Sequence, residues 1–199
     1  NRTPSNRIKF KFKFNGMLFQ LPTKFLRETN YMGNPIEPEI NMNQVAAANV
    51  IKQYVKKKYP KVVVSATSET FSMGNSVSIY LSDEVGNKID NEIYDDINNF
   101  SNQFKYGYFN GMNDSYEYNS DRTLKTEKGT NIEPGCKFMS IMNKPKHNTV
   151  PDIVRSVKEM TSDNSPFIFG TLTIEKAIKK LKDWGTSDSK INKALQLIG

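Results

Sequence analysis

The chain has few of the residues on which covalent catalysis and metal binding depend. Among its 199 residues there is one cysteine, Cys136, and one histidine, His147. A single cysteine excludes an internal disulfide, and a zinc site would need carboxylates for most of its ligands. A Cys-His nucleophilic pair is the one arrangement of its type available, and we expect instead a core thiol and a surface imidazole.

Long apolar runs are also missing. No stretch approaches the length of a membrane span, and the lysines within Ile8–Phe14 interrupt the hydrophobic stretch near the start, so we expect no signal-peptide core. Neither a phosphate-cradling Gly-x-x-x-x-Gly-Lys-Ser/Thr motif nor a dinucleotide fingerprint occurs. We therefore expect no cofactor and no membrane partner, and the lone cysteine favours a reducing compartment.

The balance of charge is positive. The net charge is +7 and the pI is near 9.3, which favours an acidic partner such as nucleic acid but also suits an ordinary globular protein rich in lysine and asparagine. With 37% hydrophobic residues the chain can bury one good core. The most one-sided stretch is residues 1–27, which hold no acid but carry Arg2, Arg7, Lys9, Lys11, Lys13, Lys24 and Arg27.

An alternating stretch near the start predicts a β-hairpin. Ile8–Phe14 places its apolar residues on one face and Lys9, Lys11 and Lys13 on the other, and Asn15-Gly16 separates it from the apolar Met17–Leu21. Asn-Gly between two apolar strands is the strongest short-range signal for such a turn. The lysines are either a solvated face that protects an edge strand or a stripe that follows phosphates.

The middle of the chain predicts an α-β-β-α unit. Helical spacing of apolar residues from Val45 ends at Pro60, so we expect a helix that stops at or just before Tyr59 and a strand that starts within a few residues. A second strand, Ser76–Ser82, alternates around Val77, Ile79 and Leu81. Helical spacing then returns at Ile89, Ile93, Ile97, Phe100 and Phe104.

Several pieces of this region carry a family resemblance. They are the end of a basic helix in Lys-Lys-Tyr-Pro, the run Ser65-Ala66-Thr67-Ser68, a Gly-Asn-Ser turn, and above all YGYFNGMNDSYEY over residues 106–118. Over about residues 43–121 the chain resembles a large-polyvalent-protein-associated domain of phages and conjugative elements. The resemblance implies a small α+β module of mobile-element origin, and it brings no catalytic residues.

The remaining segments complete an α+β fold with a small antiparallel or mixed sheet, packed helices, an N-terminal β-hairpin and a C-terminal helical segment. Prolines predict a connecting arm over 22–41, and 122–135 has the composition of an exposed charged loop. Cys136–Asn143 predicts a strand that pairs with Tyr116–Asn119. Helices are expected after Thr149, after Thr173 and from Ser187 or Asp188, the last two as an αα-hairpin. We divide the chain into residues 1–40, 41–145 and 146–199.

The candidate site residues are basic and aromatic. Tyr106 and Tyr108 belong to an aromatic concentration that could stack bases, although aromatic residues in a small sheet also serve as core. The predicted nucleic-acid-binding residues are Arg2, Arg7, Lys9, Lys11, Lys13, Lys56, Lys57, Lys58, Tyr106 and Tyr108. No catalytic or metal-binding residue is predicted, and Asp114, Glu117 and Asp121 would be the ligands if a metal-dependent nuclease were present.

These observations favour a non-enzymatic accessory protein of a phage or mobile element. We expect it to act in the bacterial host cytoplasm by binding nucleic acid or a host or phage protein, and a counter-defence inhibitor is one form of this role. The alternative from another class is a virion structural or cargo protein, which exposed apolar patches and oligomerisation would favour. A metal-dependent nuclease is a third and weaker hypothesis.

Overall fold

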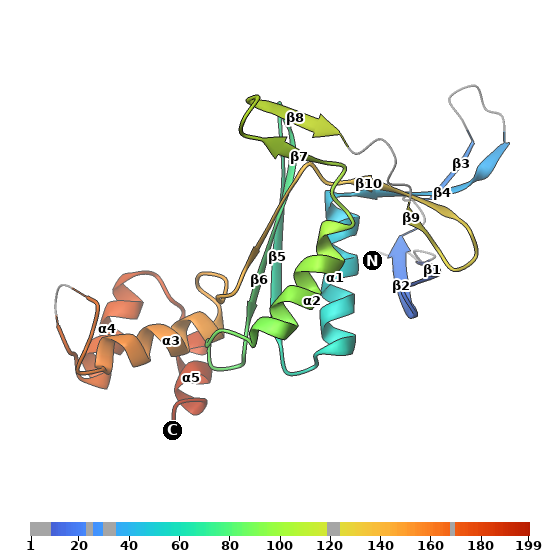
Figure 1. Ribbon diagram of the computed structural model, residues 1–199. Helices are drawn as coiled ribbons and strands as arrows, with labels where there is room; N and C mark the ends of the chain where they lie inside the picture. Colours follow the sequence, from blue (N-terminus) through green and yellow to red (C-terminus); the bar gives the residue numbers. More distant parts are fainter. Residues whose placement is uncertain (1–8, 23–25, 30–34, 119–123, 168–169) are drawn as a thin grey trace, which may run out of the picture. The chain divides into compact units, whose positions relative to one another are not determined.

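The computed structural model describes residues 9–22, 26–29, 35–118, 124–167 and 170–199 (Figure 1). In chain order the elements are β1 (Lys9–Phe14), β2 (Met17–Pro22), β3 (Leu26–Thr29), β4 (Pro35–Asn43), α1 (Gln44–Lys58), β5 (Val63–Phe71), β6 (Gly74–Ser82), α2 (Asn91–Asn102), β7 (Gly107–Asn110), β8 (Ser115–Tyr118), β9 (Leu124–Lys125), β10 (Asn131–Gly135), β11 (Phe138–Met142), α3 (Val150–Thr161), α4 (Ile174–Asp183) and α5 (Asp188–Gln196). Small antiparallel and mixed sheets, an N-terminal β-hairpin and C-terminal helices confirm the predicted α+β class.

The chain divides into two compact units. Unit 1 comprises Asn1–Lys58, Ala66–Ile79 and Asp95–Ser140, and unit 2 comprises Tyr59–Ser65, Tyr80–Tyr94 and Ile141–Gly199. Strands β5, β6 and β11 and helix α2 contribute residues to both. The division into residues 1–40, 41–145 and 146–199 that we expect from the sequence stays a prediction.

The N-terminal hairpin forms as predicted. β1 and β2 pair antiparallel from Lys9–Pro22 to Phe14–Met17, and the connecting Asn15 and Gly16 have φ of 47° and 73°. Two consecutive left-handed residues are the mark of a type I′ turn, which matches the twist of the strands. Phe12 and Phe14 are buried while Lys11 and Lys13 are exposed, so the alternation read from the sequence holds for these residues.

The core of unit 1 is built from aromatic rings. Phe100 of α2 stacks on Tyr54 of α1 with ring centroids 3.8 Å apart, because the two helices lie side by side (Figure 1). Phe14 and Phe19 from the hairpin each lie 6.1 Å from Phe100. Phe104 completes the cluster at 5.4 Å from Phe100. The apolar face of the hairpin is therefore covered by α1 and α2.

Helix α1 begins and ends at local signals. The Asn43 side chain accepts a hydrogen bond from the Ala46 N–H at 3.0 Å, which caps the N-terminus. The helix ends at Lys58 and β5 begins at Val63, so the prediction of a stop before Tyr59 and a strand soon after Pro60 is confirmed. The side chain of Gln53 holds the free edge of β2, since its amide accepts from Gln20 N–H and donates to Gln20 C=O, both at 3.0 Å.

The connecting arm predicted over 22–41 is wrong, because β3 and β4 form there. Pro35 is the first residue of β4, where a missing N–H costs no ladder bond. Pro38 falls beside the register shift between Arg27 and Thr29 of β3, and the pairing with β10 begins only at Glu39. The two prolines therefore occupy places in a strand where proline is tolerated.

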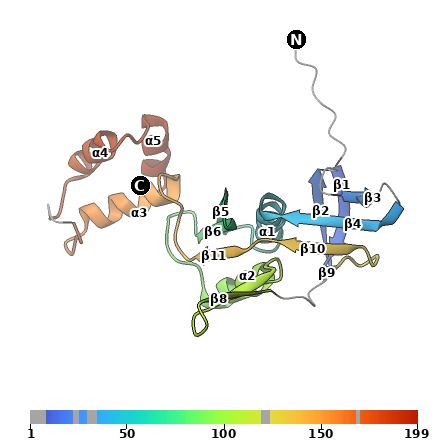
Figure 2. The same cartoon turned by 90° about the horizontal axis from the view of Figure 1, so that it is seen from above.

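The exposed loop predicted over 122–135 is also wrong for the described residues from 124 on. β10 runs parallel to β4, from Asn131 opposite Glu39 to Gly135 opposite Asn43 (Figure 2). Ile132 of β10 is completely buried and pairs with Leu124 of β9 on its other side. The segment Asn131–Gly135, although polar in composition, is therefore an inner strand of the four-stranded sheet β3-β4-β10-β9.

The predicted strands around β6 are present, but one predicted pairing is wrong. Val77, Ile79 and Leu81 of β6 are fully buried, as their alternation indicated. β11 neighbours β6 in the order β11-β6-β5, whereas β8 pairs antiparallel with β7. The short β7–β8 hairpin pairs locally, and Tyr116 of β8 contacts the other segment through side-chain interactions: its hydroxyl donates to Lys137 C=O at 2.7 Å, and its ring lies edge-on to Phe138 at 5.6 Å.

The core of unit 2 is aliphatic and helical. It contains Ile153, Val154, Val157, Met160, Ala177, Leu181, Ile191 and Ala194 from α3, α4 and α5. Thr173 caps α4 by accepting from Lys176 N–H, and Ser187 occupies the N-cap position of α5, as expected. Thr149 occupies the N-cap position of α3, but its hydroxyl donates to Lys146 C=O at 2.6 Å and makes no cap bond.

Candidate nucleic-acid interface

Lys11 and Lys13 of the hairpin are exposed, and Lys13 has a carboxylate beside it. Arg2 and Arg7 lie outside the described residues, and Lys9 lies in β1. Lys13 Nζ is 4.0 Å from a Glu127 carboxylate oxygen. Glu127 also accepts the Gly16 N–H at 3.1 Å, and its own N–H donates to Lys13 C=O. An acid therefore stands beside one end of the predicted phosphate stripe.

The lysines of α1 stabilise the fold at the helix C-terminus, where positive charge is favourable. Lys58 Nζ donates to Asp96 at 2.8 Å and to the Tyr54 hydroxyl at 3.0 Å. The bond to Asp96 is the main cause that raises the pKa of Lys58. Lys57 Nζ lies 5.3 Å from the centre of the Phe19 ring. All three predicted lysines, Lys56, Lys57 and Lys58, are exposed at this end of the helix.

The two predicted tyrosines lie on the β7–β8 hairpin and the segment before it, in different environments. Tyr106 is half-buried and stacks on Tyr118 at 5.9 Å, and burial is the main cause that raises its pKa. Tyr108 is 52% exposed, and its hydroxyl donates to the Glu117 carboxylate. This hydrogen bond raises the pKa of Tyr108 and lowers the pKa of Glu117, to which Asn110 also donates. Tyr108 is thus the one that presents a ring to solvent.

The structure adds residues that sequence reasoning missed. A groove of about 380 Å³ lies beside the β7–β8 hairpin, and we call it the tyrosine–lysine groove. It is lined by Ser76, Val77, Ser78, Lys105, Gly107, Tyr108, Phe109, Tyr116, Lys137, Phe138, Met139 and Ser140. Phe109 is 56% exposed and Phe138 is 38% exposed. A strand pattern could place Phe138, but it could not show that its ring stays partly exposed beside Phe109.

Lys137 is the organising cation of this groove. Its Nζ lies 4.8 Å from the centre of the Tyr116 ring and 5.4 Å from that of Phe138, and it donates to Met73 C=O at 2.8 Å. Its backbone is fixed as well, because the Lys137 N–H donates to the Asn75 side chain. Burial is the main cause that raises the pKa of Tyr116 to about 12. Aromatic faces and cations are thereby held next to one another.

The two residues considered for nucleophilic catalysis, Cys136 and His147, lie in opposite environments. Cys136 is completely buried, its thiol donates to Phe138 C=O at 3.0 Å, and burial raises its pKa to about 11. Such a thiol is protonated at neutral pH and is a poor nucleophile. The side chain of His147 is 96% exposed, with Nδ1 at 3.3 Å from Asp152. A core thiol and a surface imidazole were the expected arrangement.

The proposed acidic ligand set is not assembled in the part of the chain that the structure describes. Asp121 falls outside that part, Asp114 lies exposed in the β7–β8 turn, and Glu117 is occupied by Tyr108 and Asn110. Among the described residues no group of three or more histidines, cysteines or carboxylates could hold a metal ion.

Comparison with known protein families identifies a matching family. The model of large polyvalent protein associated domain 29 matches residues 42–163, which is more than half of the 199 residues. The chain belongs to this family. The match runs from the end of β4 to just past α3 and so reaches beyond the residues that carried the resemblance. Membership indicates a phage-associated protein.

Other comparisons add no relative. No curated protein and no solved structure matches the chain significantly. Among the described helices, none combines the length and the hydropathy that a membrane span requires.

Proposed function

We propose that this domain 29 protein is a non-enzymatic accessory protein of a phage or mobile element that binds single-stranded nucleic acid through the tyrosine–lysine groove. The observation that carries the proposal is the exposure of Tyr108, Phe109 and Phe138 in one groove with Lys105 and Lys137. Base stacking on aromatic rings together with cations for the backbone is the usual way to hold a single strand without reading its sequence.

The chemistry of the groove suits unpaired bases better than a duplex. Its rings offer π-faces that a duplex, whose bases are already stacked, cannot use. Tyr108 adds a hydroxyl that can meet base edges, and its hydrogen-bond partner Glu117 carries a carboxylate that repels phosphates. The net charge of +7 supplies the wider attraction for a polyanion.

A titration with fluorescently labelled DNA tests the proposal. We expect the wild type to bind a labelled oligothymidylate more tightly than a duplex of the same length. The double variant Lys105→Gln/Phe109→Ala should lose about tenfold or more, since one stacked base contributes about 1–3 kcal/mol. The matched control Leu18→Ala/Lys125→Gln removes the same charge and an exposed apolar side chain outside the groove, and it should bind nearly as the wild type does.

Two results would contradict the proposal. One is a wild type that does not bind single strands at low salt. The other is a control variant that loses as much affinity as the groove variant, because binding would then follow overall charge.

One observation favours a second candidate function, in which a host or virion protein is the partner. Phe71 stacks on Phe138 at 6.0 Å, and Met73 in the adjoining β5–β6 turn is 76% exposed. Exposed apolar side chains that contact one another are typical of protein-binding surfaces. A pull-down from infected cells with wild type and Met73→Ser/Phe71→Ser separates the candidates, because a protein partner should be lost from the variant while oligothymidylate binding persists.

A further inference from the structure

We propose that unit 2 holds a second site, a preformed pocket that binds the phosphate group of a nucleotide-sized ligand. The pocket has a volume of about 430 Å³, within the roughly 300–1,000 Å³ typical of small-molecule sites. It lies between the loop after β6, the segment after β11 and one side of α3. This site is distinct from the tyrosine–lysine groove, and neither the family match nor the proposed function assigns it.

The lining of the pocket is strongly cationic. Lys88, Lys144, Arg155 and Lys158 line it, against a single carboxylate from Glu159. The three lysines are exposed, and none of them forms an ion pair with any residue that the structure describes. Like charges gathered in one concavity repel one another, so the arrangement favours an anion that neutralises them.

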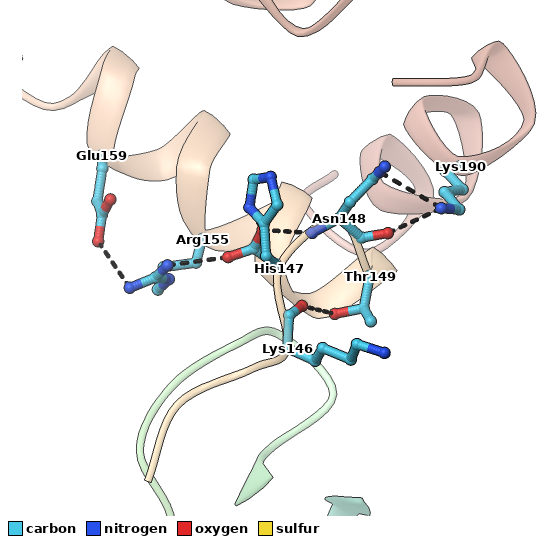
Figure 3. Close-up of polar contacts among 8 residues, drawn as sticks. Lys146, His147, Asn148, Thr149, Arg155, Glu159 and Lys190 are labelled. Atoms are coloured by element: carbon cyan, nitrogen blue, oxygen red, sulfur yellow. Dashed lines mark hydrogen bonds and ion pairs between the residues drawn. The ribbon is translucent and has the colours of Figure 1, made fainter. Parts of the chain in front are cut away.

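Arg155 is held in place by two carboxylates, so the uncompensated positive charge of the pocket comes from its three lysines. Asp152 accepts from one terminal nitrogen at 2.9 Å, and Glu159 lies 3.8 Å from the other (Figure 3). Within the described part of the chain, its Nε is buried and has no hydrogen-bond partner. A guanidinium held by carboxylates in this way keeps a fixed plane, so that only its remaining terminal N–H groups could reach a phosphate oxygen beside the lysines.

The loop that forms one wall is rigid. Asp83 accepts hydrogen bonds from Val85 N–H and Asn87 N–H, at 3.0 and 2.7 Å, and from the Asn87 side chain at 2.8 Å. Gly86 has φ of 85° and packs so closely on α3 that an added Cβ would lie 2.2 Å from Pro151 C=O. Lys88 follows directly, so its backbone is positioned before any ligand arrives.

The second wall is fixed to the first. Asn143 accepts from Ile89 N–H at 2.8 Å and donates to Ile89 C=O at 2.9 Å, which joins the two segments that carry Lys88 and Lys144. Because the walls are preformed, ligand binding does not have to order backbone, which would otherwise weaken affinity. Several cations, a polar amide and a bounded volume define a phosphorylated small molecule or a strand end as the occupant.

Calorimetric titration with AMP, and with adenosine as the ligand without phosphate, tests this site. We expect AMP to bind at low salt and adenosine not to bind. The triple variant Lys88→Gln/Lys144→Gln/Lys158→Gln should weaken AMP binding by about tenfold or more, since it removes three cations that would pair with the phosphate. The control Lys176→Gln/Lys179→Gln/Lys193→Gln removes the same charge from exposed positions on α4 and α5, and its affinity should stay within about twofold.

A variant without charge change separates the pocket from general attraction. Ser162 lines the pocket and is exposed, so Ser162→Tyr fills its volume while every lysine remains. AMP binding should fall in this variant too. Competition by oligothymidylate with and without a 5′-phosphate then tells a free nucleotide from a strand end, and either result supports a phosphate site. The proposal is overturned if the wild type does not bind AMP, if the control triple variant loses as much as the pocket variant, or if Ser162→Tyr binds normally.

Discussion

The two units bury different side chains, drawn from different distances along the chain. The core of unit 1 brings together rings from β1, β2, α1 and α2, and Phe104 just after α2. Phe14 and Phe104 lie about 90 positions apart in the sequence, yet their ring centroids are 5.9 Å apart. The core of unit 2 gathers aliphatic residues from α3, α4 and α5, which follow one another in sequence. The first core depends on long-range pairing and the second mainly on helical periodicity.

The surfaces of the two units also differ in the type of side chain that they expose. Unit 1 exposes aromatic rings around the tyrosine–lysine groove, whereas the pocket of unit 2 is lined by lysines and an arginine. Each surface is made of the side chains that do not face the core. A sheet with one covered face leaves alternate residues outside, and an amphipathic helix leaves a polar stripe. The comparison therefore predicts that the units respond to different substitutions.

The largest effect is expected in the aromatic core. Phe100→Ala removes a ring that contacts Tyr54, Phe14, Phe19 and Phe104, so the free energy of unfolding should fall by about 3–5 kcal/mol. Urea unfolding followed by far-UV circular dichroism measures it. Trp184, the single tryptophan, lies in unit 2 and packs on Phe167, so its fluorescence should shift less. Equal shifts in both signals would show that the two units unfold as one cooperative core, which contradicts the expected separate responses.

Leu181→Ala tests the other core. Leu181 is 4% exposed within the α3–α5 cluster, and its truncation should lower the free energy of unfolding by about 2–4 kcal/mol. Here the Trp184 fluorescence transition should move to lower urea more than the circular dichroism signal does. A variant whose tryptophan transition stays at the wild-type midpoint would mean that Trp184 does not report on this core.

A smaller effect depends on pH and belongs to unit 1. Burial raises the pKa of Cys136 from its ordinary 9.0 to about 11, so the unfolded chain loses this proton first. Its contribution is complete below about pH 9 and is lost as the pH rises to about 11, which lowers the free energy of unfolding by about 2 kcal/mol. Urea midpoints between about pH 8 and pH 10.5 measure the slope.

Cys136→Ser is the control for this slope, because a serine does not titrate there. The variant should keep its midpoint nearly constant up to about pH 10, where ionisation of the half-buried Tyr116 begins to matter in both proteins. An unchanged slope would assign the titration to another group. Cys136→Ser and His147→Ala should also leave nucleic-acid binding intact, and a loss in both folded variants would revive a nucleophilic role.

The smallest effect on stability is expected at the hairpin surface. Lys9→Gln/Lys11→Gln/Lys13→Gln should change the free energy of unfolding by less than about 0.5 kcal/mol, because exposed charges contribute little. If these lysines contact phosphates, the variant binds DNA more weakly with little dependence on sequence, and its affinity falls less steeply with salt. Titrations at several salt concentrations measure that slope. An unchanged slope would make the lysines a solvated edge.

Local chemistry explains which parts of the fold could be predicted. Asn15-Gly16 specifies a tight turn, Pro60 stops a helix, and the alternation around Ile79 identifies a half-buried strand. Each of these signals acts on its own neighbours, so no other part of the chain is needed to interpret it. The α+β class and the family followed from the same elements.

Long-range pairing explains the failures. Pro38 argued against a strand, but a strand can accept proline where its register shifts, and only the partners β3 and β10 show where that is. The segment around Ile132 appeared exposed because glutamate and glycine flank it. This segment is buried because it pairs parallel with β4, which lies far away in the sequence.

The hairpin, the helix ends, the positive charge and the family could all be inferred from local sequence. The folded chain was needed to show that Lys58 is held by Asp96, that Phe109 and Phe138 share one groove, and that Arg155 faces a cationic pocket. The physical reason is that periodicity shows which face of an element is apolar. It does not show which distant segment covers that face, and a binding surface consists of what remains uncovered.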